Sequence, residues 1–437
     1  MRETIGAVAI VAAAIVTPVG AAGQPASAAV PVSVAEAADR LIPVLAGANA
    51  PDAVFTSAFL GQVPPEQFNA ISAQLRARHG VPQSVESISG GVEGGGYVVR
   101  FAYERAIVSM QIYVAPDGRV AGLLITGIAP RGDSLAAVGS DFAALPGSLS
   151  WGVYRLNNRT LTRMAGADDA TPRAIASSFK LIVLGALDED VRAGRRRWDE
   201  VVPLGADVQG SATNGWPDGL PMTVHSLAVL MIEQSDNRTT DTLLHLLGRE
   251  RVERFARARD ALGGRYAYPL LSTIEVTALK APAQADLRAR WETGNESERR
   301  RLLRDQADRL TGRTVDYGAL GDGPQSIETV EWFASPRQMA GLLGWFANEA
   351  SATARGILSI NPGISPATAG RFAEVGYKGG SEPGVIAMNV MMQDSMGGWT
   401  IVTAAWNNPI APVDEQRFVE LVDRAVALSA STPPPAP

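Results

Sequence analysis

Ala176-Ser177-Ser178-Phe179-Lys180 places a serine and a lysine three residues apart, near the start of a helical pattern that runs from Pro172 to about Gly194. On a helix, side chains at this spacing lie on one face about one turn apart, so the Ser177 hydroxyl and the Lys180 amine can meet. A serine hydroxyl is a weak nucleophile at neutral pH and needs a neighbouring base. A lysine serves as that base when burial or a nearby cation lowers its pKa. The stretch therefore predicts a serine nucleophile activated by a lysine.

Lysine is scarce in this chain, which makes the position of each lysine informative. Of the 39 basic residues in the 437-residue chain, only Lys180, Lys280 and Lys378 are lysines. A chain that uses arginine almost everywhere else keeps lysine where a compact amine with an adjustable pKa is useful. Two of the three lysines lie in short motifs of small and polar residues, and these two are the candidates for catalysis.

Two further motifs follow the first along the chain. Ser235-Asp236-Asn237 precedes a helical pattern from Thr239 to Leu247, and Lys378-Gly379-Gly380-Ser381 precedes a predicted strand from Val385 to Gln393. Two glycines beside a lysine on an edge strand let the backbone approach a substrate closely. Each motif alone also fits a helix cap or a strand-entry turn. The three motifs in this order indicate a single catalytic site.

This set of motifs resembles that of the penicillin-recognising serine hydrolases, and the region from Ser150 to Leu428 resembles class A β-lactamases. The resemblance extends to the residues that follow the second motif, Ser235 to Asp241, and to Ser335-Pro336-Arg337-Gln338-Met339. It implies an α+β fold, a β-lactamase/transpeptidase-like α/β/α domain with an antiparallel sheet. It also implies hydrolysis through an acyl-enzyme, without a metal or a cofactor.

The resemblance assigns a role to each motif residue. Ser177 is expected to form the acyl-enzyme, with Lys180 as its base and Ser235 as the group that relays a proton to the leaving atom. Lys378 is expected to raise the local positive potential, which lowers the pKa of Lys180 and attracts a substrate carboxylate. The backbone N–H groups of Ser177 and Ser381 would form the oxyanion hole. The implied substrate-binding residues are Asn237, Gly379, Gly380 and Ser381.

Three features depart from the class A pattern. Gly379 lacks the hydroxyl that usually follows the motif lysine and grips the substrate carboxylate, although the hydroxyl of Ser381 can replace it. Glu275 is the acidic residue nearest the position of the deacylating glutamate, but its sequence context differs and it can equally lie on a strand and face solvent. The segment from the second motif to the third is longer than usual, and the surplus is expected between residues 280 and 327.

Other candidates carry weaker signals. Trp216, in the loop before the second motif, is a candidate for lining the site, although a tryptophan packed on its loop neighbours is the simpler interpretation. The chain has no cysteine, and His79, His225 and His245 lack a metal-binding spacing, so no disulfide, thiolate or metal site is predicted. The net charge of -6 argues against a nucleic-acid partner, which would need a basic face.

The start of the chain predicts export. Arg2, an apolar run over residues 5–16 and the small residues Ala26-Ser27-Ala28 are typical of a signal peptide, which we place at residues 1–28. The run is too short to span a bilayer, so no stable membrane anchor is expected. We expect a secreted, periplasmic protein.

The remaining segments predict two domains. Residues 29–126 show helical patterns followed by alternating strands, a pattern that resembles NTF2-like or cystatin-like α+β domains, and they contain no catalytic constellation. Residues 127–147 are rich in Gly, Ala, Pro and Ser, which predicts a linker. The hydrolase domain is expected at residues 148–430, followed by a proline-rich disordered tail at 431–437.

Together these patterns predict an exported serine hydrolase that acts on a small-molecule substrate through an acyl-enzyme. The leading substrate is a β-lactam. The alternative is a carboxylic ester, such as an ester group on a cephalosporin. A third interpretation is a penicillin-binding protein that is acylated but deacylates slowly.

Overall fold

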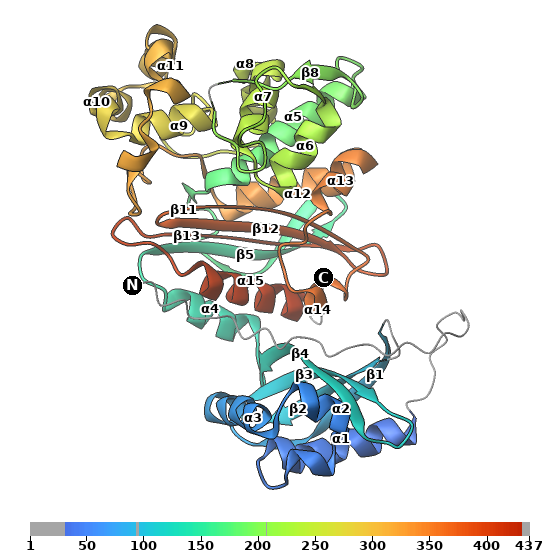
Figure 1. Ribbon diagram of the computed structural model, residues 1–437. Coiled ribbons are helices and arrows are strands. Elements are labelled where there is room, and N and C mark those ends of the chain that lie inside the picture. The colour runs from blue at the N-terminus through green and yellow to red at the C-terminus, as the bar shows by residue number, and fades with distance from the viewer. Residues whose placement is uncertain (1–30, 93–95, 207, 431–437) are drawn as a thin grey trace. The chain divides into compact units, whose positions relative to one another are not determined.

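The computed structural model describes residues 31–92, 96–206 and 208–430 (Figure 1). The chain divides into two compact units, one up to Asp133 and one from Ser134 onward. Within the described ranges, no helix is long and apolar enough to cross a membrane. The predicted signal peptide at 1–28 and the predicted tail at 431–437 lie outside the described residues.

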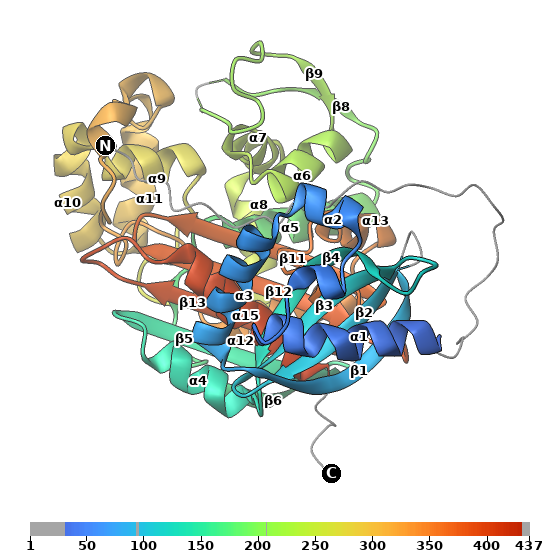
Figure 2. The same ribbon diagram turned by 60° about the horizontal axis from the view of Figure 1, so that its bottom comes forward.

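The first unit is a small α+β domain, as its sequence pattern predicts. Its four-stranded antiparallel sheet has the strand order β1-β2-β3-β4, and α1 lies across the first three strands (Figure 2). Buried apolar side chains from the helices and from alternate strand positions form one core between them. The likeness to NTF2-like or cystatin-like domains stays a prediction. The elements are α1 (Val32–Leu45), α2 (Ser57–Gln62), α3 (Pro65–His79), β1 (Pro82–Val92), β2 (Gly96–Tyr103), β3 (Ala106–Val114) and β4 (Val120–Pro130).

Regular structure replaces the linker predicted at residues 127–147. β4 extends to Pro130, and the helix α4 (Leu135–Ala143) follows within a few residues. The Ser134 hydroxyl caps this helix by accepting a hydrogen bond from the N–H of Ala137 at 3.1 Å. Val138 and Phe142 are buried in the core of the second unit. The second unit therefore begins at Ser134 and not at residue 148.

The second unit contains a five-stranded antiparallel sheet built from both ends of the unit. The strand order is β11-β12-β13-β5-β6, so the strand that carries the third motif lies at the edge. The predicted strand from Val385 to Gln393 is confirmed at both of its ends. The strands are β5 (Ser148–Asn157), β6 (Thr160–Ala167), β11 (Glu374–Glu382), β12 (Val385–Gln393) and β13 (Trp399–Asn407).

Helices cover both faces of this sheet (Figure 1). One face packs on α4 and on the closing helix α15 (Glu415–Ser429), through a core that includes Phe418 and Met388. The other face packs on α12 (Pro336–Asn348) and on a larger helical layer that includes α5 (Lys180–Arg192). The second unit is therefore the helix–sheet–helix fold that the motifs predict.

The helical layer differs from the sequence interpretation at its start. Instead of one helix from Pro172, the chain forms the short strand β7 (Arg173–Ala174), the 3-10 turn η2 (Ala176–Phe179) and then α5. Ala176 has a φ of 42°, which a continuous right-handed helix cannot contain. The other elements are β8 (Val201–Pro203), β9 (Pro221–Thr223), α6 (Val224–Glu233), α7 (Asn237–Leu247), α8 (Arg249–Ala258), α9 (Thr273–Lys280), α10 (Ala285–Thr293), α11 (Glu296–Asp305), β10 (Phe333–Ala334), α13 (Ala352–Leu358) and α14 (Pro366–Ala369).

Candidate active site

Ser177 lies in the turn that leads into the buried helix α5. The residue before it, Ala176, has a left-handed backbone conformation that side-chain-bearing residues rarely adopt and that persists where the surrounding packing enforces it. Phe179 supplies that packing, because its ring is fully buried and stacks on Trp332 with ring centroids 3.8 Å apart. The serine is thus held at a fixed point where η2 meets the sheet.

Lys180 is fully buried, one turn after Ser177. Its Nζ lies 2.5 Å from the backbone oxygen of Ser235, 3.2 Å from the Ser235 hydroxyl and 2.8 Å from Oδ1 of Asn237. Burial, helped by the charge of Lys378, holds the pKa of Lys180 well below its usual value, although Asp241 and Asp236 oppose this shift.

A neutral Lys180 has two N–H groups and one lone pair. The two closest contacts, the Ser235 carbonyl and Asn237 Oδ1, are pure acceptors and take the two N–H groups. The lone pair is then left for a hydroxyl that donates a proton, which is what a general base requires.

The Ser235 hydroxyl lies between the two motif lysines. Lys378 Nζ donates to Ser235 Oγ at 3.0 Å and to the backbone oxygen of Gly379 at 2.8 Å. Burial lowers the pKa of Lys378 to about 7. Two amines with lowered pKa values on one hydroxyl form a short path for a proton.

The edge strand β11 lies directly against the serine turn. A Cβ atom at Gly380 would overlap the backbone nitrogen of Ser177 and would lie 2.6 Å from the backbone oxygen of Ile175. Only glycine fits where backbone meets backbone this closely. This approach is what an oxyanion hole formed by the Ser177 and Ser381 amides needs.

A cavity of about 610 Å³ opens over these groups. Lys180 lies beneath it, in contact with two of its lining residues. The structure therefore brings together eight of the ten residues predicted for the site. The predicted residues that line the cavity are Ser177, Ser235, Asn237, Lys378, Gly379, Gly380 and Ser381.

Glu275, contrary to the prediction, does not line this cavity. It begins α9, where its carboxylate accepts the N–H of Ser272 at 2.8 Å in a capping box. The same carboxylate binds Arg249 through two hydrogen bonds of 2.9 and 2.6 Å. With both oxygens occupied by these donors, Glu275 stabilises the start of a helix and is not placed to activate water at Ser177.

Trp216 also lies outside the residues that line the cavity. Its side chain is 39% exposed, and its backbone oxygen accepts a hydrogen bond from Arg238 at 2.8 Å. Ser211, from the same loop, lines the cavity instead. Eleven of the 18 lining residues were not predicted from the sequence, among them Glu233, Tyr377 and Glu415. The alternation of a strand gives a signal for Tyr377, because it places this residue on the same face as Gly379.

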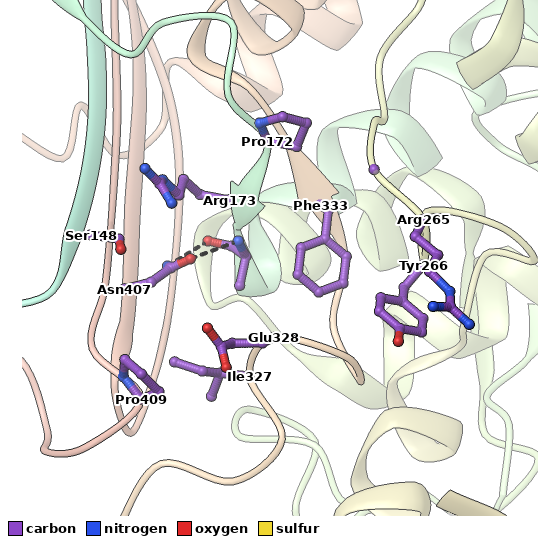
Figure 3. Close-up of a pocket in the computed structure, with 12 residues that line it drawn as sticks. Ser148, Pro172, Arg173, Arg265, Tyr266, Ile327, Glu328, Phe333, Asn407 and Pro409 are labelled. Carbon is purple, nitrogen blue, oxygen red and sulfur yellow. Dashed lines mark hydrogen bonds between the residues drawn. The ribbon is translucent and has the colours of Figure 1, made fainter. Parts of the chain in front are cut away.

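A second cavity, of about 320 Å³, lies beside β7 and is lined by none of the predicted catalytic residues (Figure 3). The Asn407 side chain in its wall accepts the N–H of Ala174 at 2.8 Å and donates to the Ala174 oxygen at 3.0 Å. These bonds tie the strand before the serine turn to β13. Asn407 thus helps to hold the serine turn in place, and its side-chain oxygen and nitrogen are both hydrogen-bonded to Ala174.

A serine at the start of a buried helix, a buried lysine and a second serine between two lysines form the arrangement expected of a serine nucleophile with a lysine base. Comparison with known families agrees, since residues 133–311 match the model Beta-lactamase2, described as a beta-lactamase enzyme family. The matched residues lie almost entirely in the second unit and include the first two motifs.

Solved structures with a similar fold include a β-lactamase from Sphaerobacter thermophilus, at 18% identity over 69% of this chain and 98% of that one, with a TM-score of 0.45. A putative class A β-lactamase, PenP from Rhodopseudomonas palustris, has 18% identity over 69% of this chain and 100% of its own, with a TM-score of 0.46. PBP-A has 14% identity over 68% and 94% of the two chains, with a TM-score of 0.46. No curated protein sequence matches the chain.

Proposed function

We propose that this protein hydrolyses β-lactams through an acyl-enzyme on Ser177. The observation that carries the proposal is the buried Lys180, whose amine has a lowered pKa and contacts the Ser235 hydroxyl. As Ser177 Oγ attacks the carbonyl carbon, its proton passes to Lys180, and the carbonyl oxygen becomes an oxyanion that the Ser177 and Ser381 amides stabilise.

Collapse of the tetrahedral intermediate breaks the bond to the leaving nitrogen, which must receive a proton. Ser235 donates that proton from its hydroxyl and recovers one from Lys180, so the lysine returns to its neutral form. Lys378 Nζ lies 3.0 Å from Ser235 Oγ. Its positive charge favours the transfer of the Ser235 proton to the leaving nitrogen, because it stabilises the negative charge that develops on Oγ. Hydrolysis of the ester by water then releases the acid and restores Ser177.

Ester hydrolysis is the second candidate, and the position of Glu275 favours it. A penicilloyl ester is long-lived unless a base activates water, and Glu275 is held by Arg249 and Ser272. A small acyl group from a simple ester leaves more room for water beside Ser177, and Lys180 can act as the base in both steps. The same observation supports slow turnover of β-lactams as a third candidate.

Intact-protein mass spectrometry after mixing with benzylpenicillin, followed over time, tests the proposal. Rapid formation of penicilloic acid without a lasting adduct supports a β-lactamase. A persistent adduct that is absent from Ser177→Ala supports a slow penicillin-binding protein. An esterase is supported if the protein hydrolyses phenyl acetate, Ser177→Ala does not, and benzylpenicillin gives neither penicilloic acid nor a persistent adduct. Retention of all activity in Ser177→Ala contradicts the acyl-enzyme mechanism itself.

We also propose that the protein is exported to the periplasm. Arg2, the apolar run at 5–16 and Ala26-Ser27-Ala28 support this proposal. N-terminal sequencing of protein recovered from the periplasmic fraction should give a chain that begins at Ala29. A chain that begins at Met1 and remains in the cytoplasmic fraction would contradict it.

A further inference from the structure

One side of the edge strand β11 turns away from the lysines and toward the closing helix α15. Tyr377 pairs with Val390 and Gly379 pairs with Met388, and both partners belong to the core that α15 covers. Side chains alternate along a strand, so Lys378 and Gly380 face the serine turn while Tyr377, Gly379 and Ser381 face α15.

The Tyr377 hydroxyl fills the space that a side chain at position 379 would occupy. A Cβ atom at Gly379 would overlap Tyr377 Oη, and a Cβ atom at Gly363 would overlap the Tyr377 ring. The ring is thus held between two glycines. Its hydroxyl has no hydrogen-bond partner among the described residues, and burial raises its pKa to about 12, so it stays a neutral hydrogen-bonding group.

Three further residues complete this end of the cavity: Met388 on β12, and Glu415 and Val419 on α15. Glu415 and Val419 are four residues apart and so lie on one face of the helix. We call Tyr377, Met388, Glu415 and Val419 the α15 subsite. Its lining combines two apolar side chains, one neutral phenol and one carboxylate.

The cavity as a whole offers little positive charge. Among the described residues that line it, Lys378 is the only basic one, while Glu233 and Glu415 are acidic. Lys378 is also engaged with Ser235 and the Gly379 oxygen, and its pKa of about 7 leaves it only partly charged at neutral pH. No arginine balances Glu415 within this lining.

The α15 subsite and the proton donor Ser235 line the same cavity. The proton for the leaving atom comes from Ser235, which contacts Lys378 on β11. A fragment that departs beside Ser235 is therefore next to β11, and the cavity continues from there to Tyr377 and Gly379 on the same strand.

We propose, resting on the ester-hydrolysis candidate above, that the leaving group reaches the α15 subsite, that this subsite selects substrates whose leaving group is uncharged, and that Glu415 disfavours leaving groups that carry a carboxylate. Glu415 is exposed, and its charge repels a carboxylate brought beside it, an effect that salt screens. The apolar side chains of Met388 and Val419 favour a neutral fragment, and the Tyr377 hydroxyl can bind a carbonyl or hydroxyl group on it.

A matched pair of esters tests this selectivity. Methyl 3-acetoxybenzoate and 3-acetoxybenzoate transfer the same acetyl group, but the second has a leaving phenol that carries a carboxylate. Each kcat/KM is divided by the rate constant for hydrolysis of the same ester by hydroxide, to remove differences in intrinsic reactivity. We expect the wild-type protein to prefer the neutral member by about tenfold.

Glu415→Gln removes the charge and keeps the shape of the side chain. It should reduce the preference at least about threefold, and low ionic strength should increase the wild-type preference. Glu420→Gln is the matched control, because this residue lies on the same helix outside the cavity lining, and its preference should equal that of the wild type. A wild-type preference for the anionic ester, or a preference unchanged in Glu415→Gln, overturns the proposal.

The same measurements separate this inference from the function on which it rests. If Ser177→Ala hydrolyses both esters as fast as the wild type, or if the wild type hydrolyses neither, ester hydrolysis at Ser177 fails and the selectivity falls with it. If hydrolysis depends on Ser177 but the preference ignores Glu415, only the selectivity is wrong.

Discussion

At Lys180, three oxygen atoms converge on one amine that solvent does not reach. Neither a carboxylate nor a phenolate is among these contacts, so no directly bonded negative charge opposes the lowering of the Lys180 pKa by burial. Lys280 shows the contrast, since it is just as buried but binds Glu331 and Glu382, and its pKa is raised. The partners of a buried lysine therefore decide whether it is a base or half of an ion pair.

Ser177→Ala tests the nucleophile. Removal of the attacking oxygen should lower kcat/KM for the fastest substrate by at least about 10⁴-fold, as for nucleophiles in other serine hydrolases. The free energy of unfolding should change by less than about 1 kcal/mol, because a single hydroxyl at a cavity surface is lost. Turnover within threefold of the wild type, measured with the same substrate, would rule out the assignment.

Lys378→Met tests the electrostatic link between the two lysines. The charge of Lys378 disfavours protonation of Lys180, so its removal should raise the pKa of Lys180. Activity requires neutral Lys180 and is lost as the pH falls through this pKa, so the acidic limb of the kcat/KM profile should move to higher pH. Lys378→Arg keeps the charge and should move the limb less. A limb that stays in place in Lys378→Met would mean that Lys378 acts on the substrate alone.

The sequence predicted the motif residues of the site well and its flanking residues poorly. The scarcity of lysine singled out Lys180 and Lys378, because a motif that needs lysine stands out in an arginine-rich chain. The prediction that Glu275 lies in the site was wrong, because it relied on the number of residues between Ser235 and Glu275 and not on the local sequence around Glu275. Ser272-x-x-Glu275 has the form of a capping box, which already indicates a helix start. The sequence did not single out Tyr377; the structure does, because its hydroxyl fills the space that a side chain at position 379 would occupy.

At the scale of elements, the contact between β11 and η2 sets the geometry of the oxyanion hole. Gly380→Ala would place a methyl group against the backbone of Ser177 and Ile175, and backbone atoms cannot swing aside as a side chain can. The strand must shift, so kcat should fall about 10²- to 10³-fold, as when an oxyanion donor is removed elsewhere. Gly356→Ala is the control, because a Cβ atom there meets nothing within 4 Å. Unchanged kcat in Gly380→Ala would show that the strand does not form the hole.

The start of α9 gives a second prediction at this scale. Glu275→Gln keeps a group that can cap the helix but loses the ion pair with Arg249, so the free energy of unfolding should fall by about 1–3 kcal/mol. Glu250→Gln, an exposed neighbour of Arg249 on α8, should change it by less than about 0.5 kcal/mol. Urea unfolding measures both. Accumulation of a penicilloyl adduct in Glu275→Gln but not in the wild type would instead restore Glu275 as the deacylating base.

The structure departs from the sequence-based expectation at two elements, α4 and the turn before α5. Residues 127–147 have the composition of a linker, yet Leu135, Val138 and Phe142 follow a helical period after the cap at Ser134. The pattern from Pro172 reads as one helix, yet Ala176 interrupts it with a left-handed residue. A left-handed alanine is enforced by tertiary packing, which no local pattern can predict.

At the scale of the whole molecule, the apolar residues divide into separate cores. One cluster contains residues of the first unit alone, from Val34 to Val120, and the clusters of the second unit begin at Val138. The sequence indicated this division through the helix-then-strand pattern of residues 29–126 and the catalytic motifs that follow it. The pairing of β13 with β5 joins residues about 250 positions apart, and the register of such a distant pairing is not specified by any local sequence pattern.

Separate cores predict that the second unit folds and reacts without the first. All five strands of its sheet and every motif residue lie after Ser134, and the described residues that line the active-site cavity all belong to the second unit. A chain of residues 134–437 should therefore unfold in one cooperative thermal transition, as a domain with its own core does. Its acylation by benzylpenicillin, or its hydrolysis of phenyl acetate, should proceed with kcat/KM within about threefold of the full-length protein, since the groups that set the pKa of Lys180 are all retained. Differential scanning calorimetry and steady-state kinetics on the two chains make the comparison, with Ser177→Ala in the short chain as the blank. A short chain that folds but loses most of its activity would show that the first unit takes part in substrate binding.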